Sequence, residues 1–356
     1  MKKILFISCI LVLTLGLVFG ESDQASAKTI KLLFASFTSA NSFMSDGLKA
    51  FGQDLEEKSK GRVKVDYSWG SALGKIPEYY DLTVRGICDV GLANPVQCAK
   101  ALFPMAEIST LPFNFPTAIQ HTKALWALYK KGYLDKTMDD DKVKALFIAG
   151  DAGSGLLTYS KKVTSLADIK GMKLHCVPGR QVDIAEAMDA VPVSMAGAEV
   201  YMALQTGTID GHTKGYSPLP RFKWCEVAKY VTEPKLGSVY FSVFMNRKSY
   251  DRLPKDIQAI IEDMTKDNKY GMIAAKQMDQ LTEAGRACLI KHGAQIVYWD
   301  PDALEELGKR FQAIWDQWIE EREAKGLPAR KALDLFYSLQ VEMGIENPAV
   351  GYQPQG

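Results

Sequence analysis

The sequence predicts an α/β protein with open, largely parallel sheets arranged in two domains. Two observations support the sheets: short buried strands alternate with amphipathic helices near the N-terminus, and residues 170–234 repeat that order. The third observation is length. The chain has 356 residues, and removal of a short N-terminal segment leaves enough for two hydrophobic cores.

Apolar periodicity defines the first unit of the chain. Ile30–Ala35 is a predominantly apolar run typical of a buried strand, and Arg62–Tyr67 alternates as a half-buried strand does. The helix between them has apolar residues at helical spacing, namely Met44, Leu48, Phe51 and Leu55. Further along come a turn at Gly70–Lys75, a short helix at Glu78–Arg85 and a buried strand at Cys88–Ala93. This β-α-β-α-β order favours parallel pairing.

The middle of the chain predicts a crossing between two domains. Three prolines place Leu102–Pro116 in a loop, and Ala118–Lys131 is an amphipathic helix. The strand Val143–Ile148 leads into Gly150–Gly155, whose glycines give the backbone the freedom that a crossing needs. Leu156–Tyr159 continues as a strand.

The stretch Lys170–Gly215 says most about function. It predicts a strand, a turn, a helix, a strand, a helix and a second turn. Polar residues gather at the turns, with His175 and Arg180 at the first and His212 and Lys214 at the second. In α/β domains, groups at strand ends and helix N-termini are the ones presented to small ligands.

The C-terminal third predicts a brace across both domains. Ser238–Met245 is a strand that we expect to return to the first domain. Pro254 then opens a helical pattern of about thirty residues, which corresponds to a helix of about 45 Å. A strand at Ile296–Trp299 and a helix capped by Asp300 follow, and we expect the tail to be loose.

The N-terminus predicts export to the periplasm. Lysines at positions 2 and 3 precede the apolar run Ile4–Phe19, and Ala-Ser-Ala at 25–27 has the form of a cleavage site. This pattern is typical of a cleaved secretory signal over residues 1–27. The alternative is a membrane anchor, but the run is shorter than the ~20 apolar residues that a spanning helix needs.

Charge and cysteine usage exclude several classes of protein. The 43 Lys and Arg residues are interspersed with 42 Asp and Glu residues, so no basic stripe for nucleic acid is present. An odd number of cysteines lies outside the signal, with no C-x-x-C spacing: Cys88, Cys98, Cys176, Cys225 and Cys288. We interpret them as buried small hydrophobic residues, although one pair remains open.

The sequence carries no arrangement typical of an enzyme or a metal site. It lacks G-x-S-x-G, a phosphate-binding glycine loop and clustered zinc ligands. His175 has only Cys176 beside it, and adjacent strand residues point to opposite faces. We therefore predict binding without catalysis. The alternative is an enzyme, namely an exported hydrolase or lyase that uses His175 or His212.

The candidate ligand-binding residues fall into three groups. The polar anchors are His175, Arg180 and Lys214, which suit an anion. Hydrogen-bonding candidates at strand–loop junctions are Asn41, Asn94 and Ser154. Candidate aromatic walls are Trp69, Tyr216 and Phe37. Several such groups must converge, because a micromolar complex needs about 8 kcal/mol.

Several motifs together resemble one family. They are Trp69–Lys75 with its A-L-G-K ending, Gly86–Gly91, S-L-A-D-I-K-G-M-K-L at 165–174, V-P-V-S-M ending at Met195, E-V-Y-M-A-L-Q-T-G-T-I-D-G at 199–211 and N-R-K-S-Y-D-R-L-P at 246–254. With these motifs the chain resembles the substrate-binding subunit of a tripartite ATP-independent periplasmic (TRAP) transporter, of the DctP-like family. The resemblance covers nearly the whole mature chain.

The resemblance implies a two-lobed periplasmic clamshell of type II, with a long helix spanning both lobes. The implied first lobe is 28–150, completed by about 238–255, and the second is 151–237. The helix at 254–290 bridges them, and 291–356 packs on the lobes. A small organic acid, a carboxylate or sulfonate, is trapped by closure and delivered to the membrane permease. We expect a monomer with no cofactor.

The chain departs from the family pattern at three positions. The family commonly has an arginine where this chain has His175, and a second arginine near Gly155. Lys214 stands where many members have asparagine or tryptophan, and a lysine repels a metal, so we predict none. Either His175, Arg180 and Lys214 together hold an anion, which we favour, or the ligand is less acidic. Coupling to a sensor instead of a permease also stays open.

Overall fold

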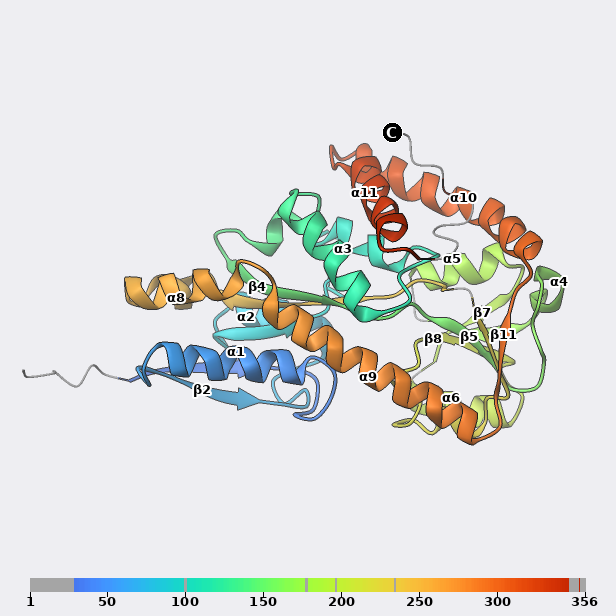
Figure 1. The fold of residues 1–356 in the computed structure, drawn as a ribbon, viewed down its shortest axis with the longest axis horizontal. Helices are drawn as coiled ribbons and strands as arrows, with labels where there is room; N and C mark the ends of the chain where they lie inside the picture. The colour runs from blue at the N-terminus through green and yellow to red at the C-terminus, as the bar shows by residue number, and fades with distance from the viewer. Residues whose placement is uncertain are drawn as a thin grey trace, which may run out of the picture.

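The computed structural model describes residues 29–98, 101–176, 179–195, 197–233, 235–345 and Tyr352. The secretory signal predicted over residues 1–27 lies outside them. The described chain forms two sheets, on the left and right of Figure 1. The first has the strand order β2-β1-β3-β10-β4, and the second has the order β11-β9-β5-β8-β6-β7.

One strand in each sheet runs against its neighbours, namely β10 in the first sheet and β5 in the second. Each is the first strand that the chain enters after leaving the other sheet. The first sheet contains β1 (Ile30–Ala35), β2 (Val63–Ser68), β3 (Val90–Ala93), β4 (Val143–Gly150) and β10 (Tyr240–Asn246). The second contains β5 (Gly155–Thr158), β6 (Lys173–His175), β7 (Val191–Val193), β8 (Gly211–Lys214), β9 (Tyr230–Glu233) and β11 (Gln295–Tyr298).

Helices pack around both sheets. The α-helices are α1 (Ser45–Lys58), α2 (Tyr79–Val84), α3 (Ala118–Lys130), α4 (Leu166–Ile169), α5 (Arg180–Ala187), α6 (Gly197–Gln205), α7 (Arg247–Asp251), α8 (Lys255–Thr265), α9 (Lys269–Lys291), α10 (Pro301–Glu323) and α11 (Ala329–Glu342). The 3-10 helices are η1 (Ile76–Glu78), η2 (Pro104–Thr110), η3 (Lys136–Met138) and η4 (Trp224–Glu226).

The chain crosses between the sheets three times, once through α9, and the other two crossing segments are hydrogen-bonded to each other. Residues 151–154 lead from β4 into β5, and residues 235–239 precede β10. The N–H group of Ser154 donates to the carbonyl oxygen of Gly237 at 2.8 Å. Gly237 has φ +98°, and a Cβ atom there would lie 2.5 Å from the carbonyl oxygen of Thr110. This crossing therefore requires glycine.

Helix α9 contacts both halves of the molecule. It packs against α1, α3 and β4 of the first half and against η4 of the second. Figure 1 shows it running diagonally past both sheets. Helix α9 therefore acts as a brace between the halves, in addition to the two crossing segments.

The prediction of one continuous helix over residues 254–290 is wrong, because the segment forms two helices, α8 and α9. The break is at Asn268, whose φ of 59° is left-handed. The Asn268 side chain accepts from the N–H of Ile148 and donates to its carbonyl oxygen, each at 2.9 Å. Because β4 is an edge strand, this amide pairs backbone groups that no neighbouring strand reaches.

The segment Leu102–Pro116, predicted as a loop, lies in the interior. It contains η2, whose residues from Met105 to Thr110 are all buried. The hydroxyl group of Tyr337 on α11 donates to the carbonyl oxygen of Pro112 at 2.7 Å. It also accepts from the indole N–H of Trp315 on α10 at 2.9 Å. The C-terminal helices thus cover the core where neither sheet does.

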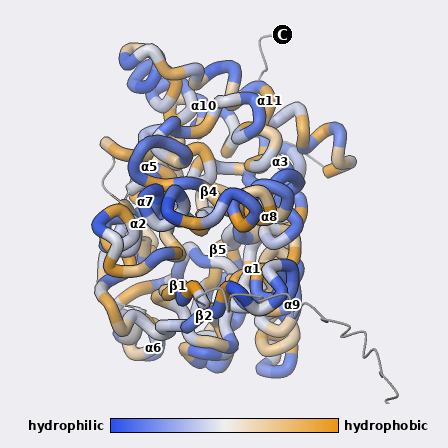
Figure 2. The backbone as a smooth tube through the Cα atoms, turned by 90° about the vertical axis from the view of Figure 1, so that its left-hand side faces the viewer, coloured by the Kyte–Doolittle hydropathy of each residue, from blue (hydrophilic) through white to orange (hydrophobic). Residues whose placement is uncertain are grey.

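The long helices are amphipathic. Figure 2 shows hydrophilic and hydrophobic residues alternating along α8, α9 and α10. Within the part of the chain that the structure describes, no helix has both the length and the apolar character of a membrane span. The predicted strands at Ser238–Met245 and Ile296–Trp299 correspond to β10 and β11.

Candidate functional site

The chain directions in the two sheets define one region where ligand contacts can converge. Strand β4 ends where the crossing to the second sheet begins, and β9 ends beside the return crossing. The strands that run parallel to β4 or to β9 therefore end at two edges that face each other, which we call the facing edges. The first carries the carboxyl ends of β1, β2 and β3, and the second those of β6 and β8. Such ends are where open α/β sheets bind ligands.

Most of the predicted site residues lie at the facing edges. The residues at the strand ends, or within two positions of them, are Phe37, Trp69, Asn94, His175, Lys214 and Tyr216. Ser154 lies in the crossing itself. Asn41 lies further along the loop after β1, and Arg180 is the first residue of α5.

His175 and His212 form a buried pair on neighbouring parallel strands. Their positions are paired in register, and their Nδ1 atoms lie 2.7 Å apart. The Nε2 of His175 is 3.1 Å from the carbonyl oxygen of Met195, which can only accept. Nε2 of His175 therefore carries a proton, and in the neutral pair its Nδ1 accepts from His212. Both nitrogens of His175 are then occupied within the protein.

The environment keeps both imidazoles neutral. Burial lowers the pKa of His175, and the charge of Lys214 lowers it further. Burial also holds the pKa of His212 well below its usual value, together with the proximity of His175 and Lys214. The remaining Nε2 of His212 is buried and has no hydrogen-bond partner among the described residues. Its ring contacts Trp224 edge to face, with centroids 4.5 Å apart.

Lys214 is the last residue of β8 and is partly buried. Burial lowers the pKa of its ammonium group, and the carboxylate of Asp151 partly opposes this effect. Burial raises the pKa of Asp151 to about 6, although the N–H of Ala152 donates to its Oδ1 at 2.8 Å. Within the described chain, no residue forms a hydrogen bond or a close ion pair with the Lys214 ammonium group. This cation is thus available to an anionic ligand.

Arg180, in contrast, is held by three carboxylates. Its guanidinium group lies 3.5 Å from Glu107, 3.0 Å from Asp183 and 3.1 Å from Glu321. Arg322 contacts the same Glu107 and lies 2.7 Å from Glu321. Because Glu107 is on η2, Arg180 on α5 and Glu321 on α10, this ion network ties three parts of the fold together.

A cavity of about 450 Å³ adjoins this ion network. It extends from Pro95 and Val96, directly after Asn94, to Arg180 and the end of α10. The residues that line it do not include His175 or Lys214. The structure thus brings His175 and Lys214 together and places Arg180 in a separate cluster. Its role as a ligand anchor stays a prediction.

The predicted aromatic walls lie in three different environments. Trp69 is partly buried and stacks on Tyr67, with centroids 5.2 Å apart. Phe37 is buried in an aromatic cluster, 5.6 Å from the ring of Tyr79. Tyr216 is buried, and two cations lie over its ring, Lys235 at 5.2 Å and Arg286 at 5.3 Å. Trp69 is therefore the only one of the three with appreciable exposure.

The predicted hydrogen-bonding residues also differ. Asn94 is buried, and its Oδ1 has no partner within the described chain, so it can accept from a ligand. Ser154 is buried, with its backbone N–H and carbonyl groups used in the crossing. Asn41 is exposed, and its Oδ1 accepts from Lys49 at 3.4 Å. Asn94 has the best placement of the three.

The sequence analysis missed several residues that form the site or stabilise the fold around it, because their partners are distant in sequence. Asp151 is far from Lys214 in sequence, and the crossing brings its carboxylate close enough to affect the Lys214 charge. Glu107 is likewise far in sequence from Arg180, which it contacts. Cys225 and Cys288 form a disulfide, with Cα atoms 5.8 Å apart and a separation of 63 positions in sequence. The other described cysteines, Cys88, Cys98 and Cys176, are free and buried. No spacing rule singles out the pair that is joined.

Comparison with known proteins identifies relatives over most of the chain. Residues 34–322 match the bacterial extracellular solute-binding proteins of family 7, DctP. A solute-binding protein of Albidiferax ferrireducens is 28% identical over 282 residues, which cover 77% of this chain and 81% of the relative. The C4-dicarboxylate-binding periplasmic protein DctP of Rhodobacter capsulatus is 26% identical, with coverage of 74% and 80%.

Solved structures have the same fold. A TRAP periplasmic solute-binding protein of Desulfovibrio salexigens superposes with a TM-score of 0.81 at 24% identity, covering 91% of this chain and 99% of that one. A TRAP solute-binding protein of Rhodoferax ferrireducens, in complex with copurified benzoate, gives a TM-score of 0.75 at 25% identity, with coverage of 89% and 99%. These matches confirm the predicted two-lobed α/β clamshell.

Family membership confirms the prediction of a binding protein without enzymatic activity. Members of this family are periplasmic receptors that bind small molecules and work with a TRAP permease. The match spans most of the chain, from β1 to α10. The chain belongs to family 7 of the bacterial extracellular solute-binding proteins, the DctP family of TRAP transporters.

Proposed function

We propose that the protein is a periplasmic receptor for a small organic acid with a single carboxylate or sulfonate group. One observation carries the proposal: the ammonium group of Lys214 is partly buried at the facing edges, and no residue in the described chain pairs with it. An unpaired cation removed from water is unfavourable, and an anion in contact with it offsets that cost. Lobe closure would complete the desolvation.

The distribution of the other charges favours a ligand with one negative group. Arg180 is held by Glu107, Asp183 and Glu321, and His175 is neutral with both ring nitrogens occupied. Asp151 adds a carboxylate close to Lys214, and a second negative group on the ligand would be repelled by it. The sequence predicts that His175, Arg180 and Lys214 share the anion. We now propose that Lys214 alone supplies the positive charge that binds it.

One hydrogen-bond acceptor and one aromatic ring add to this proposal. The unpaired Oδ1 of Asn94 can accept from a hydroxyl or amide group of the ligand. Trp69 offers a partly exposed ring at the end of β2. A hydroxy acid with an apolar or aromatic body suits all three residues. Its anionic group would contact Lys214, its hydroxyl group would donate to Asn94, and its apolar part would pack on the ring of Trp69.

The solved relatives support an acidic ligand. Their bound ligands include benzoate, (R)- and (S)-mandelate, 3-hydroxybenzoate, galacturonate and glucuronate. Each of these has one carboxylate. The relative from Rhodobacter capsulatus is named for C4-dicarboxylates. A ligand screen therefore has to compare monocarboxylates with dicarboxylates.

The remaining parts of the proposal concern the working cycle. The segment 1–27 directs export and is removed, and the mature chain binds as a monomer without a metal in the ligand site. Ligand contacts across the facing edges raise the population of the closed form. The closed form then docks on a TRAP permease. The alternatives are a less acidic ligand and a sensor as the partner.

A ligand screen tests the proposal. Thermal unfolding of the exported protein would be followed with benzoate, mandelate, pyroglutamate, succinate, malate, small sulfonates, amines and neutral sugars. A ligand bound only to the folded form raises the melting temperature. We expect shifts from monoanionic acids that exceed those from dicarboxylates, and recovery of the ligand unchanged. Shifts from neutral sugars or amines alone would contradict an acidic ligand, and turnover would indicate the hydrolase or lyase.

A further inference from the structure

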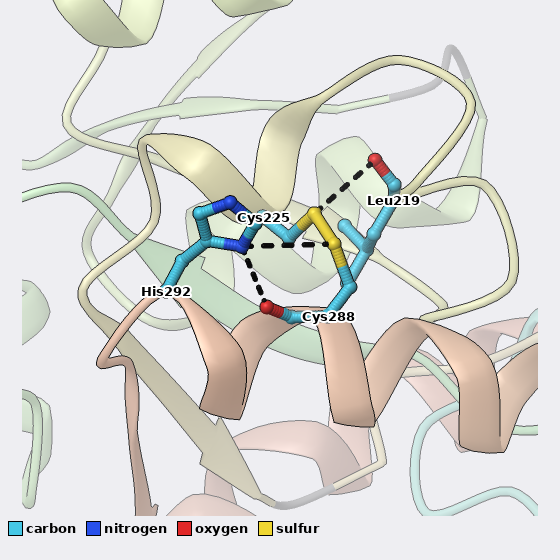
Figure 3. Close-up of a disulfide and its surroundings, with 4 residues drawn as sticks. All are labelled: Leu219, Cys225, Cys288 and His292. Atoms are coloured by element: carbon cyan, nitrogen blue, oxygen red, sulfur yellow. Dashed lines mark hydrogen bonds between the residues drawn. A yellow bond between two sulfur atoms is a disulfide. The ribbon is translucent and has the colours of Figure 1, made fainter.

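The end of helix α9 carries a second cluster of reactive side chains, away from the ligand strands. Cys288 and His292 lie one helical turn apart, and Cys225 reaches them from η4 (Figure 3). Cys225 and Cys288 form the disulfide. In the described chain this is the one group of three or more side chains whose ligand atoms are close enough to hold a metal ion.

The geometry of the cluster suits a metal once the sulfur–sulfur bond is opened. The three ligand atoms lie within 4.8 Å of one another, and Nδ1 of His292 is 3.9 Å from Sγ of Cys288. Around tetrahedral zinc with Zn–S bonds of about 2.3 Å, neighbouring ligand atoms are roughly 3.5–3.8 Å apart. The Cα atoms of the two cysteines are 5.8 Å apart, so both sulfurs reach one ion without a large backbone movement.

The cluster is accessible from one side. His292 is exposed, Cys288 is partly buried and Cys225 is buried. Nδ1 of His292 donates to the carbonyl oxygen of Cys288 at 2.8 Å, which keeps the ring near the sulfur atoms. Zinc binding through Nδ1 requires the tautomer with its proton on Nε2 and replaces this hydrogen bond. The three free cysteines are buried, and none of them belongs to a group of three or more potential metal ligands in the described structure. A soluble reductant and a metal ion therefore reach this pair in preference to the other thiols.

We propose that Cys225, Cys288 and His292 form a thiol-dependent zinc site that replaces the disulfide when the protein is reduced. A small-molecule dithiol donates two electrons and two protons to the disulfide and leaves as its own disulfide. Zn²⁺ then binds the two thiolates and the imidazole, releasing the two thiol protons, and water takes the fourth position. In both states α9 stays tied to η4.

The experiment compares zinc binding by the oxidised and reduced full chain, with Zn²⁺ alone as the probe. Binding would be measured by competition with a chromophoric chelator, and proton release by calorimetry in two buffers. The reduced wild type should bind one Zn²⁺ per chain, with about two protons released. The oxidised wild type should bind none. The reduced protein with Zn²⁺ should melt at a higher temperature than without it.

Two variants separate this site from background thiols. Cys225→Ser/Cys288→Ser keeps the three free cysteines and should bind no Zn²⁺ at micromolar concentration. His292→Ala is a surface change that keeps both cysteines, and it should weaken Zn²⁺ binding by at least the roughly 10–100-fold seen for lost outer-shell partners. Equal zinc affinity in the reduced wild type and either variant overturns the proposal, as does the absence of zinc uptake by the reduced wild type.

Discussion

The Nδ1 atoms of His175 and His212 are 2.7 Å apart, and one proton lies between them. The two residues are register partners on the parallel strands β6 and β8, so their side chains project from the same face of the sheet. The carbonyl oxygen of Met195 fixes the tautomer of His175. At the paired positions of β6 and β8 this chain therefore has a neutral histidine pair that supports the strand ends.

We predict that His175→Ala destabilises the fold, because it leaves the Nδ1–H of His212 and the carbonyl oxygen of Met195 without partners. The free energy of unfolding at pH 8 should fall by about 2–4 kcal/mol. Urea denaturation measures it. An unchanged midpoint would show that the pair contributes nothing to stability.

The same variant should change the pH dependence of stability. The lowered pKa of His175 means that the unfolded chain binds more protons below pH 6.5, so stability falls as the pH falls. One such histidine contributes at most about 1.4 kcal/mol per pH unit. The loss of stability between pH 7 and pH 5 should be smaller in His175→Ala than in the wild type, and an equal loss contradicts the neutral pair.

Lys214→Met should abolish ligand binding without destabilising the protein. The variant removes the cation proposed to hold the ligand anion, which corresponds to about 2–5 kcal/mol of binding energy. Isothermal titration calorimetry with the best acid from the screen measures the affinity. The unliganded variant should melt at the same temperature or higher, because a partly buried, unpaired ammonium group is gone.

The matched control is Lys173→Met. Lys173 is exposed at the opposite end of β6, so the net charge changes equally while the facing edges stay intact. Ligand affinity should match that of the wild type. Equal losses in the two variants would point to a general electrostatic effect instead of a contact at Lys214.

Arg180→Gln should destabilise the fold through the ion network. The Arg180 side chain is 6% exposed, and its removal takes away one of the two arginines that contact the Glu107 and Glu321 carboxylates. Breaking a buried pair from one side costs about 3 kcal/mol or more. Lys309→Ala, in an exposed pair with Glu305, should leave the unfolding midpoint nearly unchanged. Similar effects of the two variants would contradict a buried network.

Asp135→Asn should stabilise the protein at high pH. Burial raises the pKa of Asp135 to about 7, and its Oδ2 has no partner in the described chain. The protonated form is preferred in the fold, so its contribution is complete below pH 3.8 and is lost as the pH rises through 7. The variant keeps an acceptor for the N–H of Met105 and carries no charge.

The gain from Asp135→Asn should reach about 4 kcal/mol at most near pH 8 and vanish near pH 4. Chemical denaturation of both proteins at a series of pH values measures the difference. The pKa of Asp151, which burial raises to about 6, lies in the same range, and the comparison of variant with wild type isolates Asp135. A constant difference at all pH values would contradict the raised pKa.

Local patterns were sufficient to predict most strands and helices. The alternation in Arg62–Tyr67 and the capping pattern at Asp300 appear in the structure as β2 and α10. The sequence also correctly placed His175 at the end of a strand, but the turn predicted at His212 and Lys214 is wrong, because both residues lie on strand β8, which pairs with β5 and β6. These features depend on residues close together in sequence, where periodicity and capping chemistry act.

Long-range pairings could not be predicted in the same way. Arg180 has the composition of a ligand anchor, and only the packing of η2 and α10 shows that Glu107 and Glu321 occupy it. The helix break at Asn268 depends on an edge strand far away in sequence. Apolar spacing continues through the break, so the periodic signal contains no sign of it.

The two hydrogen-bonded crossings limit how the lobes can move relative to each other. Asp151 and Ser154 donate to Val239 and Gly237 at 3.0 and 2.8 Å, and so the crossings form a short two-stranded ribbon. We predict that this ribbon, together with α9, which also connects the halves, restricts lobe closure to bending of the ribbon out of its plane. Ligands of different size would then change the angle between the lobes in the closed form, while the direction of closure stays the same.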